Sequence, residues 1–549
     1  MPTILERRSF LLGAGVLLAA SRLAAAGKEL DCDVAVIGGG VGGFAAALAA
    51  LRNGMRVVLT EETDWIGGQL TAQAVPPDEH PWIEQFGSTA SYRAYRNAVR
   101  AYYRDHYPLT EEARRRVDLN PGNGSVSRLT HEFKVSVAVL EGMLAPYAGS
   151  GQLILLREHM PVSATTAGDR VTSIAVRDLR RGVDRTVSAR YFLDATELGE
   201  LLPMAKIEFV TGAESQKETG EMHAAAEPQP ANSQSFTYCF AMDYFPGEDH
   251  TIERPASFSE WQNYVPKLTP PWTGRLFSWT MCEPKTLAPR QAFFDPEPKD
   301  SDRAGLNLWI YRRIADRTNF VSGAYKSSIT LVNWPQNDFW LSDLITAAPA
   351  DRPKLLDRAK QLSLSFLYWM QTDAGWKGLR LRKDIVDTED GMAKTAYIRE
   401  SRRIKAEFTI LEKHVGTQMR NSAPAEVFPD SVGVGCYRID LHPSAGETNY
   451  IDVSSLPFQI PLGALISQRI ENLLPCCKNI GTTHITNGCY RLHPVEWSIG
   501  EAAGALAAHA IATKQTPRAV RNTPRRLTEF QNKLRHQGFE LEWPHIHPV

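Results

Sequence analysis

The 549-residue sequence lacks several features that mark large classes of protein. It has seven cysteines and no C-x-x-C pair, so it shows neither a disulfide framework nor the ligand spacing of a structural zinc site. Its formal net charge is -1, which gives no electrostatic footprint for nucleic acid or a membrane surface. We therefore expect a globular chain with no metal site, no nucleic-acid partner and no membrane span once the N-terminal region is removed.

The N-terminal region has the pattern of an export signal. Arg7 and Arg8 precede an apolar run over residues 10–20, and Ala24-Ala25-Ala26 offers an A-x-A cleavage site. The apolar run is shorter than the roughly 20 residues of a membrane-spanning helix. The sequence predicts a signal peptide over residues 1–26, recognised by the twin-arginine export machinery, and a periplasmic or secreted protein. An ordinary secretory signal that carries two arginines is the alternative.

A glycine-rich segment follows the first strand-like run of the mature chain. Gly38, Gly40 and Gly43 form G-x-G-x-x-G between a strand pattern at 33–37 and a helical pattern that Gly54 ends. In such a segment the first glycine permits a tight turn, and the second leaves room for a pyrophosphate. The third lets the helix pack closely, and the helix N-terminus stabilises the phosphate charge. A glycine-rich turn in another α/β fold is the alternative.

The residues after this segment favour a dinucleotide and, within that class, a flavin. Glu61 ends a second strand-like run about 20 residues on, where a carboxylate can accept hydrogen bonds from ribose hydroxyls. Gly67 and Gly68 follow at once and let the backbone approach a diphosphate or a flavin. The predicted cofactor-binding residues of this half are Gly38, Gly39, Gly40, Gly42, Gly43, Glu61, Gly67, Gly68 and Gln69.

The next part of the chain contains three strand-like runs between residues 151 and 200, expected as an antiparallel meander over the parallel sheet. The third ends in Asp194-Ala195-Thr196, which resembles the "ATG" segment of flavoproteins, and Asp194 is a further predicted cofactor-binding residue. Glu197 stands where that segment has glycine.

The remaining sequence indicates a discontinuous cofactor domain. Proline-rich stretches and eight of the 12 tryptophans lie in a long central region, where core packing is favoured over a stacking surface. We expect a FAD-binding domain over 31–204 and 446–515, an inserted α+β substrate domain over 205–445, and a C-terminal extension over 516–549.

Several blocks then resemble one family. "GGGVGGFAAALAALRNG", "TDWIGGQLT", "DATELGE", "YIRESRRI", "ENLLPCCKNI" and "RLHPVEWSIGEAAGALAAHAIA" occur in order. Together they resemble the FAD-dependent oxidoreductases distantly related to fumarate reductases and aspartate oxidases. The resemblance covers nearly all of the chain after residue 30. It implies noncovalent FAD and an α/β fold of the glutathione-reductase-like, two-dinucleotide-binding (Rossmann-type) class.

The resemblance also assigns residues in the last part of the chain. It implies that Gly481 lies near the cofactor and that Gly500, Glu501 and Ala502 open the final helix, whose N-terminus faces the flavin N1–C2=O edge. Glu501 is expected to hydrogen-bond the ribityl chain. The charged block Arg399, Glu400, Arg402 and Arg403 is instead expected on a solvated or ion-paired helix face.

Three residues are candidates for the chemistry. Histidine suits proton transfer near neutral pH, and His484 and His442 lie in family-like blocks close to the expected cofactor segments. Arg491 is a candidate for holding an anionic substrate or stabilising a reduced flavin. For either histidine alone, a role in packing is an equally good interpretation.

The sequence thus predicts an exported FAD-dependent oxidoreductase. It is expected to take a hydride from a small alcohol, amine or saturated C–C bond and to pass electrons to oxygen or a periplasmic acceptor. Reduction of a C=C bond is the first alternative. A non-catalytic exported protein that binds flavin or another ligand is the alternative from a different class.

Overall fold

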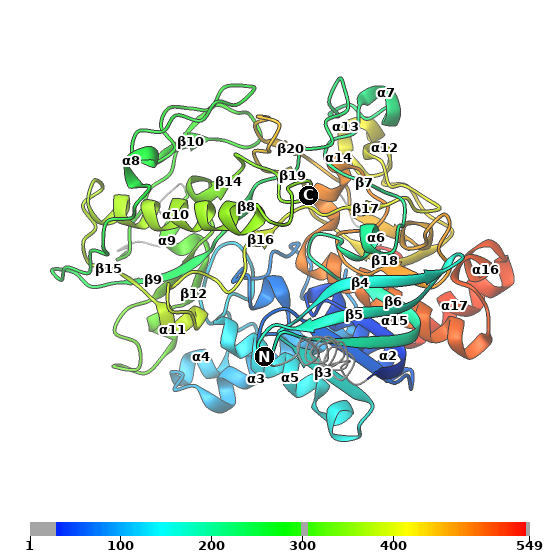
Figure 1. Ribbon diagram of the computed structural model, residues 1–549. Helices are drawn as coiled ribbons and strands as arrows, with labels where there is room; N and C mark the ends of the chain where they lie inside the picture. Colours follow the sequence, from blue (N-terminus) through cyan, green and yellow to red (C-terminus); the bar gives the residue numbers. More distant parts are fainter. Residues whose placement is uncertain (1–28, 298–305, 545–549) are drawn as a thin grey trace, which may run out of the picture.

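The computed structural model describes residues 29–297 and 306–544 (Figure 1). The predicted signal peptide lies outside the described residues. The main sheet has the strand order β3-β2-β1-β6-β5-β4, and β22 also pairs with β6. Its strands are β1 (Leu30–Ile37), β2 (Val57–Glu61), β3 (Leu153–Arg157), β4 (His159–Ala167), β5 (Arg170–Asp178), β6 (Val183–Asp194) and β22 (Leu473–Pro475).

Strand β6 joins a parallel part of this sheet to an antiparallel part. It pairs in parallel with β1 and β22, and antiparallel with β5. The expected three-stranded meander is therefore wrong in one strand, since β3 pairs in parallel with β2 and belongs to the parallel part. The antiparallel part consists of β4, β5 and β6. The physical reason is the long crossover from β2 to β3, which ends in helix α5 (Phe133–Gly149) and returns β3 parallel beside β2.

Two helices pack closely beside the parallel strands. Helix α2 (Val41–Arg52) follows β1, and α15 (His493–Thr513) lies against it with nearly every side chain buried. A Cβ at Gly500 would lie 2.0 Å from the Gly42 oxygen, and one at Gly504 would lie 2.1 Å from the Ala46 oxygen. These two glycines let the helix backbones touch, as small residues do at close helix contacts.

The central region has its own apolar cluster and small antiparallel sheets, drawn in green at the left of Figure 1 beside the long α10. Trp261, Trp309 and Trp334 are fully buried there, which confirms core packing for these tryptophans. Its larger elements are β8 (Phe236–Thr237), β9 (Phe240–Tyr244), β12 (Arg313–Ala315), β13 (Ile329–Val332), β14 (Asp338–Phe339), β15 (Leu379–Leu381), β16 (Tyr397–Ile398) and α10 (Arg352–Gln371).

The remaining elements surround these two regions. They include β7 (Phe209–Val210), β10 (Thr280–Cys282), β11 (Pro289–Gln291), β17 (Arg403–Ile404), β18 (Ser431–Gly435), β19 (Ile439–Leu441), β20 (Ile451–Val453), β21 (Phe458–Pro461), α3 (Ala90–His106), α4 (Glu111–Arg115), α6 (Leu201–Met204), α7 (Gln216–Thr219), α8 (Phe258–Trp261), α9 (Leu308–Tyr311), α11 (Lys383–Val386), α12 (Glu412–Val415), α13 (Thr417–Arg420), α14 (His484–Tyr490), α16 (Pro517–Asn522) and α17 (Pro524–His536). In the described ranges, no helix is both long and apolar enough to cross a bilayer. The predicted domain boundaries stay a prediction.

Candidate functional site

A turn of glycines joins β1 to α2 where the sequence predicts the cofactor cradle. Gly38 has φ +102°, and a Cβ there would lie 2.3 Å from the Ala195 oxygen. A Cβ at Gly43 would lie 2.0 Å from the Gly38 oxygen. Both positions therefore accept glycine alone. Gly40 differs, because its φ is -62° and an added Cβ would meet only the Glu197 carboxylate, at 2.9 Å. Apart from the Glu197 side chain, the fold leaves room above Gly40, where the motif requires space for a pyrophosphate.

Residues from β2 and the next loop complete this cradle. The Gly39 amide donates to Glu61 Oε2 at 3.2 Å, so Glu61 lies at the turn as predicted. The Gly67 amide donates to the Gly39 oxygen at 2.7 Å. A Cβ at Gly68 would lie 2.8 Å from the Gly40 Cα. The second glycine pair thus packs directly on the first.

An open cavity of about 310 Å³ lies over this cradle. It is lined by Gly38, Gly39, Gly40, Thr60, Glu61, Glu62, Gly68, Ala72, Gln73, His159, Pro161, Ala195, Thr196, Glu197, Leu198, Glu200, Tyr238, Leu344, Arg352, Leu356, Lys394, Thr395, Ala396 and Ile398. Several lining residues are acidic, and the buried Oε1 of Gln73 has no hydrogen-bond partner among the described residues. The glycine cradle, the acidic residue at the end of β2 and this orphaned polar atom fit a dinucleotide.

Asp194 supports the cradle from behind. Its Oδ1 accepts from the Thr196 amide at 3.1 Å and from the Thr196 hydroxyl at 2.6 Å. Burial raises the pKa of Asp194 to about 7, against the lowering effect of these hydrogen bonds. The side chain does not line the cavity. It fixes the turn after β6, which carries Ala195 and Glu197 to the cavity wall.

The predicted start of the final helix is wrong, because the helix begins earlier in the sequence. Helix α15 begins at His493, with Pro494 in its first turn, so Gly500, Glu501 and Ala502 lie two turns inside it. The Glu501 carboxylate accepts from Ser91 Oγ at 2.5 Å and pairs with Arg52 at 3.2 Å. These contacts fix α15 to α2 and α3. The structure therefore does not bring Gly500, Glu501 or Ala502 to the cavity.

Gly481 is likewise held by other contacts. A Cβ there would lie 2.5 Å from the Phe408 oxygen, and the Gly481 amide donates to the Ala464 oxygen at 2.8 Å. Gly481 is absent from the cavity lining. Its small size admits the 406–410 segment beside the start of α14, so the position serves packing in this structure.

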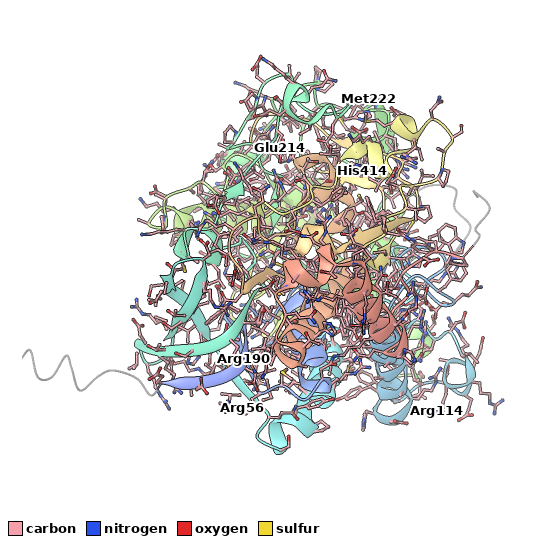
Figure 2. The ribbon with its side chains drawn as sticks, turned by 90° about the vertical axis from the view of Figure 1, so that its right-hand side faces the viewer. Arg56, Arg114, Arg190, Glu214, Met222 and His414 are labelled. Carbon is pink, nitrogen blue, oxygen red and sulfur yellow. The ribbon has the colours of Figure 1, made fainter. Side chains whose placement is uncertain are left out.

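The three catalytic candidates lie on adjoining elements. His484 begins α14, Arg491 follows its end, and His442 follows β19. Helix α14 packs on β19 so closely that a Cβ at Gly488 would lie 2.9 Å from the Asp440 amide nitrogen. In Figure 2, Glu214, which accepts the His484 amide at 2.9 Å, lies near the upper end of the molecule, and Arg56, just before β2, lies at the lower end. The candidates therefore gather where α14 packs on β19, and none of the three lines the cavity over the cradle.

Each histidine is held by a buried carboxylate. Nδ1 of His484 lies 2.9 Å from Glu400 Oε2, and Nδ1 of His442 lies 2.6 Å from Asp338 Oδ2. Nε2 of His442 lies 3.5 Å from Asp440 Oδ2, so its ring stands between two carboxylates. Nε2 of His484 has no hydrogen-bond partner in the described part of the chain. A carboxylate on Nδ1 orients the imidazole and holds its proton on that nitrogen, which leaves Nε2 as the basic atom.

Arginines neutralise these carboxylates. Arg491 donates to Asp440 Oδ2 at 3.0 Å and to the Tyr397 hydroxyl at 2.8 Å. Arg399 pairs with Asp338 at 2.9 Å, and Arg403 pairs with Glu400. The expectation of ion pairs for the 399–403 block is confirmed, but the expected helix and its solvated face are wrong, because the block is extended and buried. Arg402 is the exception to the pairing, since it donates to the Leu198 oxygen. A buried charge needs such partners to offset its loss of hydration.

These pairs determine the charge state of the acids. Burial raises the pKa of Asp338, but Arg399 and His442 outweigh burial and lower it overall. Burial likewise opposes the net lowering of the pKa of Glu400, which His484 and Arg403 cause. We call the set of His484, Glu400, Arg403, His442, Asp338, Arg399, Asp440, Arg491 and Tyr397 the histidine–carboxylate network.

Gln234 and Gln69 connect parts of the site. The backbone amide of Gln234 donates to Glu400 Oε2 at 3.0 Å. The side-chain oxygen of Gln234 accepts a hydrogen bond from the backbone amide of His442 at 3.4 Å. Gln69, in the second glycine loop of the cradle, donates from Nε2 to the Arg491 oxygen at 3.1 Å. The cradle and the histidine–carboxylate network are therefore joined by one side chain.

Sequence reasoning missed the carboxylate partners. Asp440 had a usable signal, because D-x-H on a strand places Asp440 and His442 on one face. Asp338 had none, since it lies 104 positions from His442.

The comparison with protein families agrees with the geometry of the cradle. Residues 33–534 match the family model described as FAD dependent oxidoreductase. Among solved structures, a variant of E. coli quinol fumarate reductase FrdA is 12% identical over 93% of this chain and 74% of its own, with a TM-score of 0.34. L-proline dehydrogenase from P. horikoshii is 16% identical over 34% and 24%, with a TM-score of 0.18. The rebeccamycin biosynthetic enzyme RebC with reduced flavin is 15% identical over 40% and 38%, with a TM-score of 0.22.

The matched segments span less than two thirds of the proline dehydrogenase chain and of RebC. No curated protein matches this sequence.

Proposed function

This chain belongs to the FAD-dependent oxidoreductase family, and on that premise we propose that it takes a hydride from a small organic substrate at the histidine–carboxylate network. The substrate class is an alcohol, an amine or a saturated C–C bond. Bound FAD supplies the hydride acceptor. The observation that carries the proposal is His484, whose ring is held at Nδ1 by Glu400 and whose Nε2 is unpaired in the described residues.

His484 acts as the general base in this proposal. When the substrate C–H bond gives its electron pair and hydrogen as hydride, the proton of the neighbouring O–H, N–H or, for a saturated C–C bond, C–H group must leave. Nε2 of His484 takes that proton, and Glu400 stabilises the positive charge that forms on the ring. Arg491 orients the substrate, because Asp440 fixes it and its buried Nε has no hydrogen-bond partner among the described residues. His442 lies beside it on the same Asp440 and helps to position the substrate from a partly exposed ring.

FAD is held noncovalently in this proposal, at the glycine cradle. Gly38 to Gly40 and the α2 N-terminus face the diphosphate, and Glu61 accepts hydrogen bonds from the ribose. The parallel strands with an antiparallel addition through β6 support a two-dinucleotide-binding domain of the glutathione-reductase type.

The test is anaerobic reduction of the bound flavin by a panel of alcohols, amines and saturated acids. We expect one class to bleach the flavin in a single turnover and to do so far more slowly in His484→Gln, with FAD content unchanged. Electrons then pass from the reduced flavin to oxygen or to a periplasmic acceptor. Comparing the rate of flavin re-oxidation in air with the rate by a quinone distinguishes the two. If no member of the panel bleaches the flavin and an unsaturated acid rapidly re-oxidises the reduced enzyme, C=C reduction would replace this proposal.

We further propose export through the twin-arginine pathway to the periplasm or beyond, on the pattern of residues 1–26. The test is cell fractionation of the full-length protein beside a variant with Arg7→Lys and Arg8→Lys. The variant is expected to stay in the cytoplasm with its flavin. Equal export of both proteins would contradict the twin-arginine route.

A further inference from the structure

The N-terminal end of α2 is surrounded by carboxylates in this chain. The Gly42 amide donates to Glu496 Oε1 at 3.3 Å. Glu197 Oε1 lies 2.9 Å from the position of a Cβ at Gly40 and 3.2 Å from one at Gly68. A helix N-terminus with nearby glycines is the place where a diphosphate binds. The Glu197 carboxylate therefore stands in the space that the cofactor requires.

Lys478 is the cation that joins these two carboxylates. Its Nζ lies 2.5 Å from Glu197 Oε2 and 3.7 Å from Glu496 Oε2, and its side chain has no exposed surface. Burial alone favours loss of the lysine proton, but the two carboxylates outweigh burial and raise the pKa of Lys478. Lys478 is therefore a buried ammonium that needs an anion beside it.

The topology of the sheet brings this pair together. Strands β6 and β22 run in parallel, with Asp194 beside Pro475. Glu197 and Lys478 each lie three residues beyond those partners, so both side chains emerge at the same carboxyl edge. Ligands of open α/β sheets bind at this edge.

The two partners of Lys478 differ in freedom. Glu496 is buried on α15 and also accepts from Gln69 at 2.8 Å. The Glu197 side chain is 28% exposed and lines the open cavity. Only Glu197 can turn away into water while Lys478 and Glu496 keep their places.

We propose that Lys478 binds the FAD diphosphate and that Glu197 holds this place until the cofactor displaces it. The proposal rests on the proposed FAD site. A diphosphate beside Glu197 would meet a like charge, whereas a diphosphate in place of Glu197 gives Lys478 a stronger acceptor. Glu197 therefore keeps the buried lysine paired without cofactor and lowers the affinity for FAD by competition.

The experiment measures binding to the cofactor-free protein by calorimetry, with ADP and adenosine as a matched ligand pair and FAD alongside. Lys478→Gln is expected to weaken ADP and FAD about 10-fold or more, the size of a lost charge-assisted hydrogen bond. Adenosine, which lacks the diphosphate, is expected to bind within about 2-fold of its wild-type affinity. Lys478→Arg is expected to recover most of the lost affinity, because it restores the charge.

Glu197→Gln gives the opposite sign. It keeps the size of the side chain and removes the charge that competes, so ADP and FAD are expected to bind about 3-fold to 10-fold more tightly. Lys394→Gln is the matched control, since Lys394 lines the same cavity but pairs with Asp64 at 3.0 Å. If Lys394→Gln lost as much ADP affinity as Lys478→Gln, any positive charge near the cavity would have the same effect. That result would overturn the proposal.

Each remaining outcome decides one claim. If Lys478→Gln does not fold, the sign of the Glu197→Gln effect alone decides, and unchanged or weaker binding overturns the proposal. If the wild-type protein binds ADP and FAD but no variant changes the affinity, this inference fails and the proposed function stands. If the wild-type protein binds no FAD, the proposed function itself fails.

Discussion

Two groups of buried carboxylates lie in this molecule, and their pKa values are shifted in opposite directions. Around the cradle, burial raises the pKa of Glu61, Asp194 and Glu496 to about 7 each. In the histidine–carboxylate network, pairing lowers the pKa of Asp338 and Glu400 despite equal burial. The difference is the supply of cations, since each network acid lies against an arginine and a histidine.

This difference separates a binding region from a reacting region. The network neutralises itself and holds its side chains in fixed positions, as general acid–base chemistry requires. The cradle has glycines, an adjoining cavity and few cations near its acids. It therefore suits a ligand that supplies its own hydrogen-bonding groups to these acids. Substitutions in the two regions should therefore act differently on flavin reduction, FAD affinity and stability.

The largest effect is expected for loss of the base in the network. His484→Ala should slow anaerobic reduction of the flavin by the substrate by about 10²-fold to 10⁴-fold. The FAD content should not change, because the ring lies outside the cradle. Stopped-flow absorbance gives the reduction rate, and the flavin-to-protein ratio gives the content. An equal reduction rate in His484→Ala and wild type would remove His484 from the reaction.

The next effect is expected for Gly40, at the center of the cradle. Gly40→Val should weaken FAD binding by about 100-fold or more, because its side chain fills the space above the turn. Its φ suits any residue, so the melting temperature without cofactor should stay within a few degrees. Gly142→Ala, where an added Cβ meets nothing within 4 Å, is the control. Full FAD affinity in Gly40→Val would place the cofactor elsewhere.

A smaller effect is expected in the pH dependence of stability. A raised pKa in the folded protein gives stability that is present below pH 4.5 and is lost as pH rises through about 7. Glu496→Gln should therefore flatten the decline in the unfolding free energy of the cofactor-free protein between pH 4.5 and 8, by roughly 1–3 kcal/mol. Urea unfolding at several pH values measures it. An unchanged slope would show that Glu496 titrates at its ordinary pKa in the folded protein.

The smallest effect on the cofactor is expected for Glu501. Glu501→Gln weakens contacts to Ser91 and Arg52 that fix α15 and should cost roughly 1–3 kcal/mol of unfolding free energy. Since Glu501 does not line the cavity, the FAD dissociation constant should stay within about 2-fold. A large loss of FAD affinity at unchanged stability would restore the ribityl role that the family resemblance implied.

The strand, glycine turn and helix of the cradle were predicted correctly because their signals are local. Strand β1, the glycine turn, α2 and Glu61 lie within about 30 residues, and their spacing follows from the shape of a dinucleotide. The network is assembled from distant segments, and no periodicity joins Asp338 to His442. The 399–403 block misled because four charges in five residues are usually solvated, and only tertiary contacts supply the counter-ions here. The start of α15 was misplaced because the family resemblance assigned Gly500 to the helix N-terminus, whereas that glycine serves helix packing.

The most direct test of the account is the absorption spectrum of the purified protein, taken before and after acid precipitation, with Gly40→Val purified in parallel. We predict that the wild-type protein carries flavin and releases FAD into the supernatant, and that Gly40→Val is folded and nearly colourless. A colourless wild-type protein that cannot be reconstituted with FAD would contradict the account.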